Sequence, residues 1–158
     1  MPPPTDVILA VDPGVGGGSA LYRKSTGKIT LRKWTTESEH LSFVAFMANT
    51  DREVTAVIEN VPAYVSAATS NASSFKLGYN FGFHVGVMRA YGVSVNLVNP
   101  KKWQKGLLGL KPNMGTTARK RTLKDNAVRL YPDQDGIINA TADALLILNW
   151  WMTDPWMR

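Results

Sequence analysis

Val7-Ile8-Leu9-Ala10-Val11-Asp12-Pro13-Gly14 is an uncharged apolar run that ends abruptly on a carboxylate and a turn. Its β-branched residues and the closing Pro-Gly predict a buried strand that carries Asp12 to one edge of a sheet. Burying a lone carboxylate is costly unless it gains a hydrogen-bonding turn, a cation or a metal as a partner. Taken alone, Asp12 could serve only to shape the turn, so its role depends on whether other acids reach the same edge.

A second acid follows the same pattern in Val54-Thr55-Ala56-Val57-Ile58-Glu59, another apolar, β-rich run, which Asn60-Val61-Pro62 brings to an end. If the two runs are parallel neighbours in one sheet, Asp12 and Glu59 lie side by side at one end of it. The alternative is a surface glutamate at the end of a strand. Two apolar strands that each end on an acid favour the shared site.

A third acid, Asp143, lies near the start of a strongly apolar segment that runs from about Asn139 to Trp151. The segment predicts a helix buried against the sheet, with Asp143 at its charged end. Asn139 lies four residues earlier, on the same helical face and one turn away. Considered alone, Asp143 could be only a capping or dipole partner of this helix.

The composition restricts the kind of metal that these acids could bind. The 158 residues are enough for one domain with its own core, and they include no cysteine and only two histidines. Thiolate sites are therefore excluded, and imidazole sites have few ligands to draw on. A metal would be held by oxygen atoms, which favours magnesium or manganese. No apolar run is long enough for a membrane span, and Met1–Asp6 is neither a signal nor a transit peptide.

The positive charge is concentrated in one part of the chain. The net charge is +6, but residues 60–124 contain ten of the 18 Lys and Arg residues and none of the 12 acids. A solvated protein surface normally mixes the two signs. A long basic segment without acids predicts a polyanionic partner, and nucleic acid is the commonest one.

The remaining segments predict a mixture of strands, helices and loops. A hairpin around residues 25–28 joins two alternating strands, and the glycines at 14–18 let the backbone come close to a group beside Asp12. These glycines lack the Gly-Lys-Ser/Thr of a phosphate loop, so no nucleotide cofactor is expected. Further along we expect a helix at 41–48, a loop at 63–76, a glycine-striped helix packed closely on a neighbour, a strand at 93–98, a short helix at 101–105, an irregular segment at 106–117 and a basic helix at 118–130.

Together these motifs resemble RuvC-like Holliday-junction resolvases of the ribonuclease H-like superfamily. The motifs are the strand with Asp12-Pro13-Gly14 and its hairpin, Ile58-Glu59-Asn60, and Ala142-Asp143-Ala144-Leu145-Leu146-Ile147. Gly82-Phe83-His84-Val85-Gly86, Val98-Asn99-Pro100-Lys101-Lys102-Trp103 and the basic helix up to Leu130-Tyr131-Pro132 look most like the phage and chloroplast types. The resemblance covers about residues 7–150.

The resemblance implies an α/β fold of the ribonuclease H type, with a five-stranded mixed sheet in the order 3-2-1-4-5 flanked by helices. It implies a single RuvC-like nuclease domain over residues 1–158, with flexible tails at 1–6 and 153–158. The expected protein is a homodimer in the cytoplasm of a bacterial or phage-infected cell, and it makes paired cuts in four-way junction DNA.

The resemblance also assigns roles to individual residues. Asp12, Glu59, Asp143 and Asn139 would hold two Mg²⁺ or Mn²⁺ ions per site, and Lys120 would stabilise charge on the phosphate. The residues expected to contact the DNA backbone are Lys101, Lys102, Lys105, Arg119, Lys120, Arg121 and Lys124. Lys76, at the end of the expected loop, and Tyr79 and Asn80, on the glycine-striped helix, complete the expected DNA-binding surface.

The chain departs from the family at Asn139, where the family has an acid or a histidine. An amide can bind a cation through its oxygen but brings no charge, and Asp135 is a weaker substitute. Asn139 is therefore either a natural variation or an inactivating substitution. The alternatives are a catalytically impaired junction-binding protein and a less selective nuclease of branched DNA. Actin-like and sugar-kinase ATPases share this sheet, but they need a second, larger lobe for which 158 residues leave no room.

Overall fold

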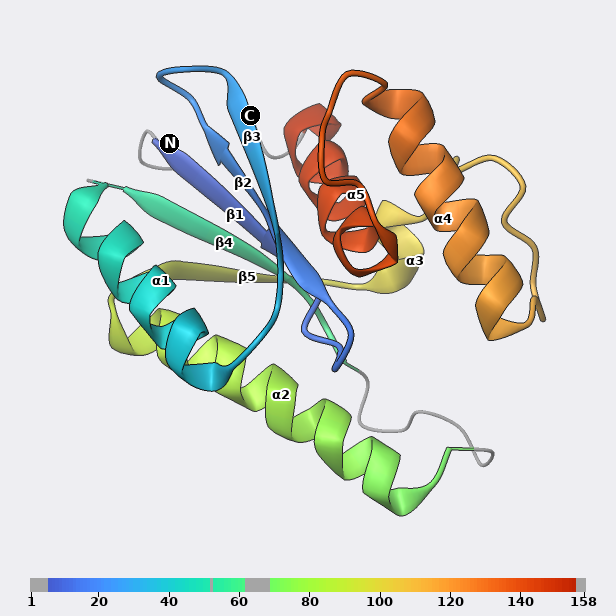
Figure 1. Ribbon diagram of the computed structural model, residues 1–158, viewed down its shortest axis with the longest axis horizontal. Coiled ribbons are helices and arrows are strands. Elements are labelled where there is room, and N and C mark those ends of the chain that lie inside the picture. Colours follow the sequence, from blue (N-terminus) through green and yellow to red (C-terminus); the bar gives the residue numbers. More distant parts are fainter. Residues whose placement is uncertain (1–5, 52, 62–68, 156–158) are drawn as a thin grey trace.

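The structure is a computed structural model, and it describes residues 6–51, 53–61 and 69–155. Within these ranges, five strands form one sheet with helices on both faces (Figure 1). The elements along the chain are β1 (Val7–Val11), β2 (Gly18–Arg23), β3 (Lys28–Lys33), α1 (Glu37–Thr50), β4 (Val54–Glu59), α2 (Asn71–Ala90), β5 (Ser94–Val98), α3 (Pro100–Trp103), α4 (Thr116–Leu130) and α5 (Asn139–Thr153).

The sheet is mixed and has the order β3-β2-β1-β4-β5, which confirms the predicted order 3-2-1-4-5. Strands β1, β2 and β3 form an antiparallel meander, whereas β1, β4 and β5 are parallel. Val11 lies opposite Ile58 in the β1–β4 register. The residues that follow these two, Asp12 and Glu59, therefore leave neighbouring strands at the same edge of the sheet.

Two hydrophobic layers enclose the sheet. Helices α1 and α2 cover one face, and α3, α4 and α5 lie on the other (Figure 1). Strand β1 is buried on both sides: Val7, Leu9 and Val11 pack toward α1 and α2, while Ile8 and Ala10 pack toward α5. Burial on both faces explains why β1 is an unbroken apolar run rather than an alternating one.

Several helices begin earlier than the sequence pattern predicts. Helix α2 begins at Asn71, so residues 71–76 of the predicted loop are helical, and residues 62–68 lie outside the described residues. The Ser70 side chain caps α2 by accepting a hydrogen bond from the Ser73 N–H at 3.2 Å. Thr36 caps α1 in the same way, which starts that helix at Glu37 rather than 41. Short polar residues favour helix caps as much as loops, and this made the two boundaries ambiguous.

The predicted close packing of the glycine stripe on α2 is wrong within this chain. Gly78, Gly82 and Gly86 are exposed, and a Cβ atom added to any of them would meet no atom within 4 Å. The predicted tails include Asp6, whose N–H donates to Glu53 O at 3.1 Å, and Thr153, the last residue of α5; residues 1–5 and 156–158 are not described. No helix in the described part of the chain has the length and apolar character needed to cross a membrane.

Candidate active site

Asp12 is held by the turn that follows β1. Its carboxylate accepts a hydrogen bond from the Gly14 N–H at 3.0 Å, and its carbonyl accepts one from the Trp34 indole N–H at 3.0 Å. A Cβ atom on Gly17 would lie 2.3 Å from that carbonyl and 2.9 Å from the carboxylate. The glycine-rich turn therefore wraps around Asp12 itself, and Gly17 is required for this close approach.

Glu59 leaves the end of β4 and meets α3. Its Oε2 accepts a hydrogen bond from the Trp103 indole N–H at 2.8 Å. Trp103 is 2% exposed, so the donor is fixed by core packing. Sequence reasoning missed Trp103 as the partner of Glu59, because the two residues are 44 positions apart in sequence.

Asp143 is brought to the site by the start of α5. The Thr141 hydroxyl donates to Gly136 O at 2.7 Å and accepts from the Ile138 N–H at 3.0 Å, which fixes the first turn. Strand β2 passes so close that a Cβ atom on Gly18 would lie 2.6 Å from Ala140 O. This contact holds the first turn of α5, and with it Asp143, against the sheet.

The three carboxylates are close enough for the charge of Asp12 to raise the pKa values of the other two. Burial raises the pKa of Glu59 to about 8, with further contributions from the charges of Asp12 and Asp143. Burial, followed by the charge of Asp12, raises the pKa of Asp143 to about 7. Burial also raises the pKa of Asp12, although the Gly14 N–H and Lys120 oppose this shift. The structure thus brings together the three acids that the sequence singled out.

Two cations from the first turns of α4 face these acids. Lys120 lowers the pKa values of Asp12 and Asp143, and Arg119 lowers those of Glu59 and Asp143. The Arg119 guanidinium donates a hydrogen bond to the side-chain oxygen of Gln104, just beyond α3. Arg119, predicted to contact the DNA backbone, is thus also a neighbour of the carboxylates, and sequence reasoning missed its anchor Gln104.

Asn139 is the first residue of α5 and lies one turn before Asp143. Its side chain is exposed, and it forms no hydrogen bond with the described part of the chain. This position, at which the resemblance predicted an acid or a histidine, carries an uncharged amide. Nothing else in the structure assigns Asn139 a structural role.

The donor set fits a hard divalent cation. It offers carboxylate oxygens, the ligands that Mg²⁺ and Mn²⁺ prefer. The pKa values of Glu59 and Asp143 are raised first by burial and then by neighbouring carboxylate charge, which the nearby cations offset only in part. As they stand, no three His, Cys, Asp or Glu side chains of residues 6–51, 53–61 and 69–155 form a group that could hold one ion. Mg²⁺ commonly binds through one or two carboxylates and keeps several waters, so a group of three acids on one ion is not required.

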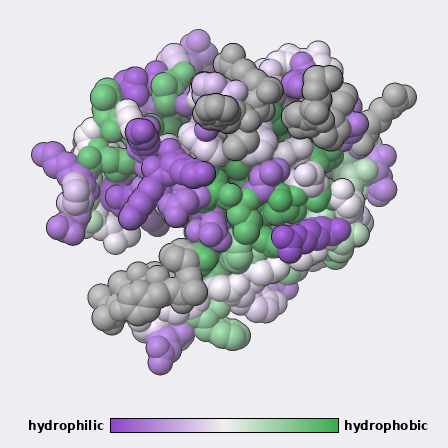
Figure 2. All heavy atoms as spheres, turned by 180° about the vertical axis from the view of Figure 1, so that it is seen from behind, coloured by the Kyte–Doolittle hydropathy of each residue, from purple (hydrophilic) through white to green (hydrophobic). Residues whose placement is uncertain are grey.

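The other residues predicted to bind DNA lie mainly on the surface around this site. Seen from behind, hydrophilic side chains gather on the side of the molecule where α3 and α4 lie (Figure 2). Lys101, Lys102, Lys105 and Arg121 are exposed, and Lys124 is half-buried. On α2, Lys76 and Tyr79 are exposed and Asn80 is half-buried.

Comparisons with known proteins identify the fold. No protein-family model and no curated protein sequence matches the chain. Two structures of Thermus thermophilus RuvC do match, each at 15% identity over 92% of this chain. RuvC in complex with Holliday junction substrate gives a TM-score of 0.56 over 94% of its chain, and a second RuvC structure gives 0.51 over 95%. The chain therefore has the RuvC fold, as the motifs predicted.

Proposed function

We propose that this chain is a divalent-metal-dependent endonuclease that cuts four-way DNA junctions. The observation that carries the proposal is the convergence of Asp12, Glu59 and Asp143, with Lys120 beside them, at the edge of the sheet where β1 and β4 end. Buried, mutually repelling carboxylates cost stability, and such an arrangement is typical of a site that functions with cations. A protein with the same fold has been captured with a Holliday junction.

The acids would hold Mg²⁺ or Mn²⁺, two ions per site, with Asn139 as a neutral fourth ligand. When bound, the metal supplies positive charge and an activated water for phosphodiester hydrolysis. Lys120 would place its ammonium group beside the phosphate and stabilise the negative charge that develops there. Trp103 would orient Glu59 through the indole N–H, and Gly14 would orient Asp12.

The basic residues of α3 and α4 would position the DNA backbone without reading its sequence. These residues are Lys101, Lys102, Lys105, Arg119, Arg121 and Lys124, joined by Lys76, Tyr79 and Asn80 on α2. A four-way junction is cut on two strands of like polarity, so we also propose that two copies of the chain act as a homodimer. The exposed glycine face of α2 is compatible with close contact between helices.

The test is cleavage of an end-labelled four-way junction with magnesium or manganese. The chain is compared with Asp12→Asn, Asn139→Asp and the control Asn49→Asp, which adds the same charge at an exposed position near the end of α1. We expect symmetric nicks that Asp12→Asn abolishes, Asn139→Asp increases and Asn49→Asp leaves unchanged. Binding without cleavage in every version would refute the nuclease. A preference for linear duplex or an RNA–DNA hybrid would refute the junction selectivity.

A second candidate is a junction-binding protein that does not cut, and the uncharged Asn139 favours it. The two candidates differ in their affinity for metal. Calorimetric titration of the chain with Mn²⁺ measures this affinity independently of DNA cleavage. Tight Mn²⁺ binding by the unmodified chain supports the nuclease. Binding that appears only in Asn139→Asp supports an impaired enzyme.

A further inference from the structure

A cavity of ≈ 230 Å³ adjoins the turn that holds Asp12. Three segments line it: the turn after β1 with Gly14 and Val15, the connection from β3 together with the first turn of α1, and the middle of α2 with Asn80 and Phe83. Gly14 is also the residue whose N–H binds the Asp12 carboxylate. One wall of the cavity is therefore shared with the candidate active site.

Four aromatic rings pack together along one side of the cavity. Trp34 lies 4.4 Å from His40 and 4.6 Å from His84 between ring centroids, and Phe83 lies 5.6 Å from His40. The two imidazoles bond to each other, with His84 Nδ1 3.1 Å from His40 Nε2. The Trp34 indole N–H, bound to the carbonyl of Asp12, ties this cluster to the end of β1. The cluster thus forms one wall of the cavity beside the strand that carries Asp12, with Trp34 and Phe83 half-buried and both imidazoles buried.

The charge of the cavity restricts what can enter it. Burial lowers the pKa values of His40 and His84 to about 4 and about 3, so both rings are neutral near pH 7. Among the described residues that line the cavity, Glu37 alone is formally charged, and neither Lys nor Arg takes part. A phosphate would find no cation in this lining. The rings and the Asn80 amide suit a neutral planar group with hydrogen-bonding edges. The Thr35 hydroxyl already donates to Glu39, so it can only accept a hydrogen bond from such a group.

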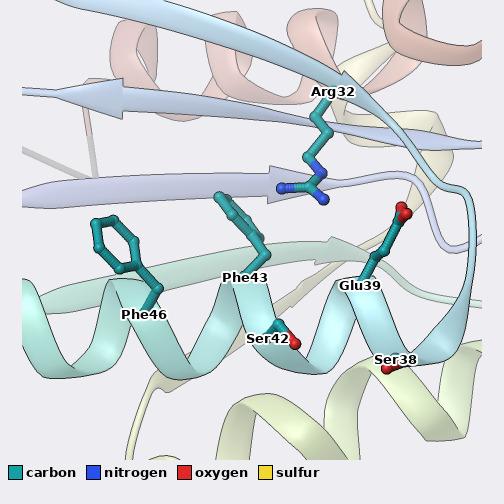
Figure 3. Close-up of a pocket in the computed structure, with 6 residues that line it drawn as sticks. All are labelled: Arg32, Ser38, Glu39, Ser42, Phe43 and Phe46. Atoms are coloured by element: carbon teal, nitrogen blue, oxygen red, sulfur yellow. The ribbon is translucent and has the colours of Figure 1, made fainter.

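A larger hollow of ≈ 310 Å³ between β3 and α1 has a different character (Figure 3). It contains both Arg32 and Glu39, and the Arg32 guanidinium already lies over the Phe43 ring, 4.9 Å from its centroid. No residue of the turn after Asp12 lines it. Its half-buried Phe43 ring is already covered by Arg32, and it lacks the connection to the active site.

We propose that the cavity beside Asp12 receives one unpaired nucleobase of the DNA strand that is bound at the active site. This inference rests on the proposed function, because it takes branched DNA as the substrate. A cavity of about 150 Å³ can accept benzene, so ≈ 230 Å³ leaves room for a base that enters at least in part. Bases at a junction are already interrupted in their stacking, which lowers the cost of moving one out of the helix.

The test measures the affinity of the chain for junctions that lack a single base. An abasic nucleotide is placed in turn at each position around the crossover, and the Kd is measured by fluorescence anisotropy without divalent cations. We expect one position at which loss of the base weakens binding about tenfold, the size of one lost stacking contact. The other positions should have little effect.

Two variants change the cavity, and a third variant serves as their control. Asn80→Ala removes the amide at the cavity, and Val15→Trp fills the entrance from a side chain that is 65% exposed and outside the core. Both should weaken binding of the intact junction and remove the penalty at the sensitive position. Asn49→Ala, the same change as Asn80→Ala but on an exposed part of α1 outside the lining, should behave as the unmodified chain.

The possible outcomes distinguish failure of the base-binding role of the cavity from failure of the proposed nuclease function. Uniform affinity for all abasic junctions, or a penalty that survives in both variants, would overturn the base-binding role while junction binding stands. Equal affinity for the junction and a linear duplex would overturn the proposed function and this inference together. Thermal melting of each variant establishes that altered binding does not arise from unfolding.

Discussion

Removing the charge of Glu59 should stabilise the metal-free protein at alkaline pH. Its pKa is raised from an ordinary 4.5 to about 8, chiefly by burial and then by the charges of Asp12 and Asp143. The folded protein therefore binds more protons than the unfolded chain between these two values. Stability must fall as the pH rises through that window. In Glu59→Gln the amide carries no charge, so this part of the pH dependence disappears.

The size of the effect follows from the width of the window. Each pH unit within it costs about 1.4 kcal/mol per titrating group, so raising the pH from about 6.5 to about 8 should lower the free energy of unfolding by about 2 kcal/mol through Glu59. Asp143, with a pKa of about 7, adds a smaller loss in the same direction. His40 and His84, with pKa values of about 4 and about 3, are neutral in the folded protein throughout this range. In the unfolded chain their ordinary pKa of 6.5 leaves them partly protonated at the lower pH, so they add a smaller gain in stability as the pH rises, and this gain is the same with and without Glu59.

Urea denaturation at the two pH values measures the difference directly. The unmodified chain should lose about 2 kcal/mol more than Glu59→Gln, and Glu39→Gln, a matched change at an exposed position on α1, should behave like the unmodified chain. Magnesium should restore stability at the higher pH in the unmodified chain more than in Glu59→Gln. Equal pH slopes for the two proteins would refute the account of mutually repelling buried acids.

Two further substitutions test how the acids are held. Trp103→Phe removes the N–H bound to Glu59 while keeping an aromatic ring. The pKa of Glu59, measured by NMR titration, should rise, and the affinity for Mn²⁺, measured by calorimetry, should fall. An unchanged pKa would contradict the positioning role of Trp103. Gly17→Ala places a Cβ atom 2.3 Å from the carbonyl of Asp12, so it should lower the free energy of unfolding in urea by about 1–3 kcal/mol. In the control Gly16→Ala the added Cβ atom meets nothing within 4 Å, so the free energy of unfolding should hardly change. Equal losses in the two alanine variants would show that the close approach is not what requires glycine.

The sequence predicted the central strands well because their burial leaves a local signal. Strand β1 is apolar throughout, β4 is interrupted only by Thr55, and each leads directly to an acid, so their positions and their shared edge follow from the residue pattern alone. The start of α2 does not, because Ser70 and the polar residues after it suit a loop and a helix cap equally well. Close packing of the glycine stripe on that helix was wrongly predicted for a similar reason, since the spacing of the glycines does not show whether another element lies against them.

The contacts of Trp103 with Glu59 and of His84 with His40 could not be predicted for a different reason. Trp103 lies 44 residues from Glu59, and His84 lies 44 residues from His40. Neither contact follows from a repeat or from helical spacing, because both depend on how separate elements pack against the sheet. The register offered one clue: β5 lies beside β4, so a residue just beyond the end of β5 can reach Glu59.

The alternation of side chains along β1 has a consequence for how this chain can change in length. Val11 and Ile58 face the α1–α2 layer, so Asp12 and Glu59, one residue further on, are due to face the layer that contains α5 and Asp143. Deleting or inserting one residue within β1 or β4 would turn an acid into the wrong layer and expose part of the core. Length variation should therefore be confined to surface connections such as residues 106–115, while the two strands keep their residue count.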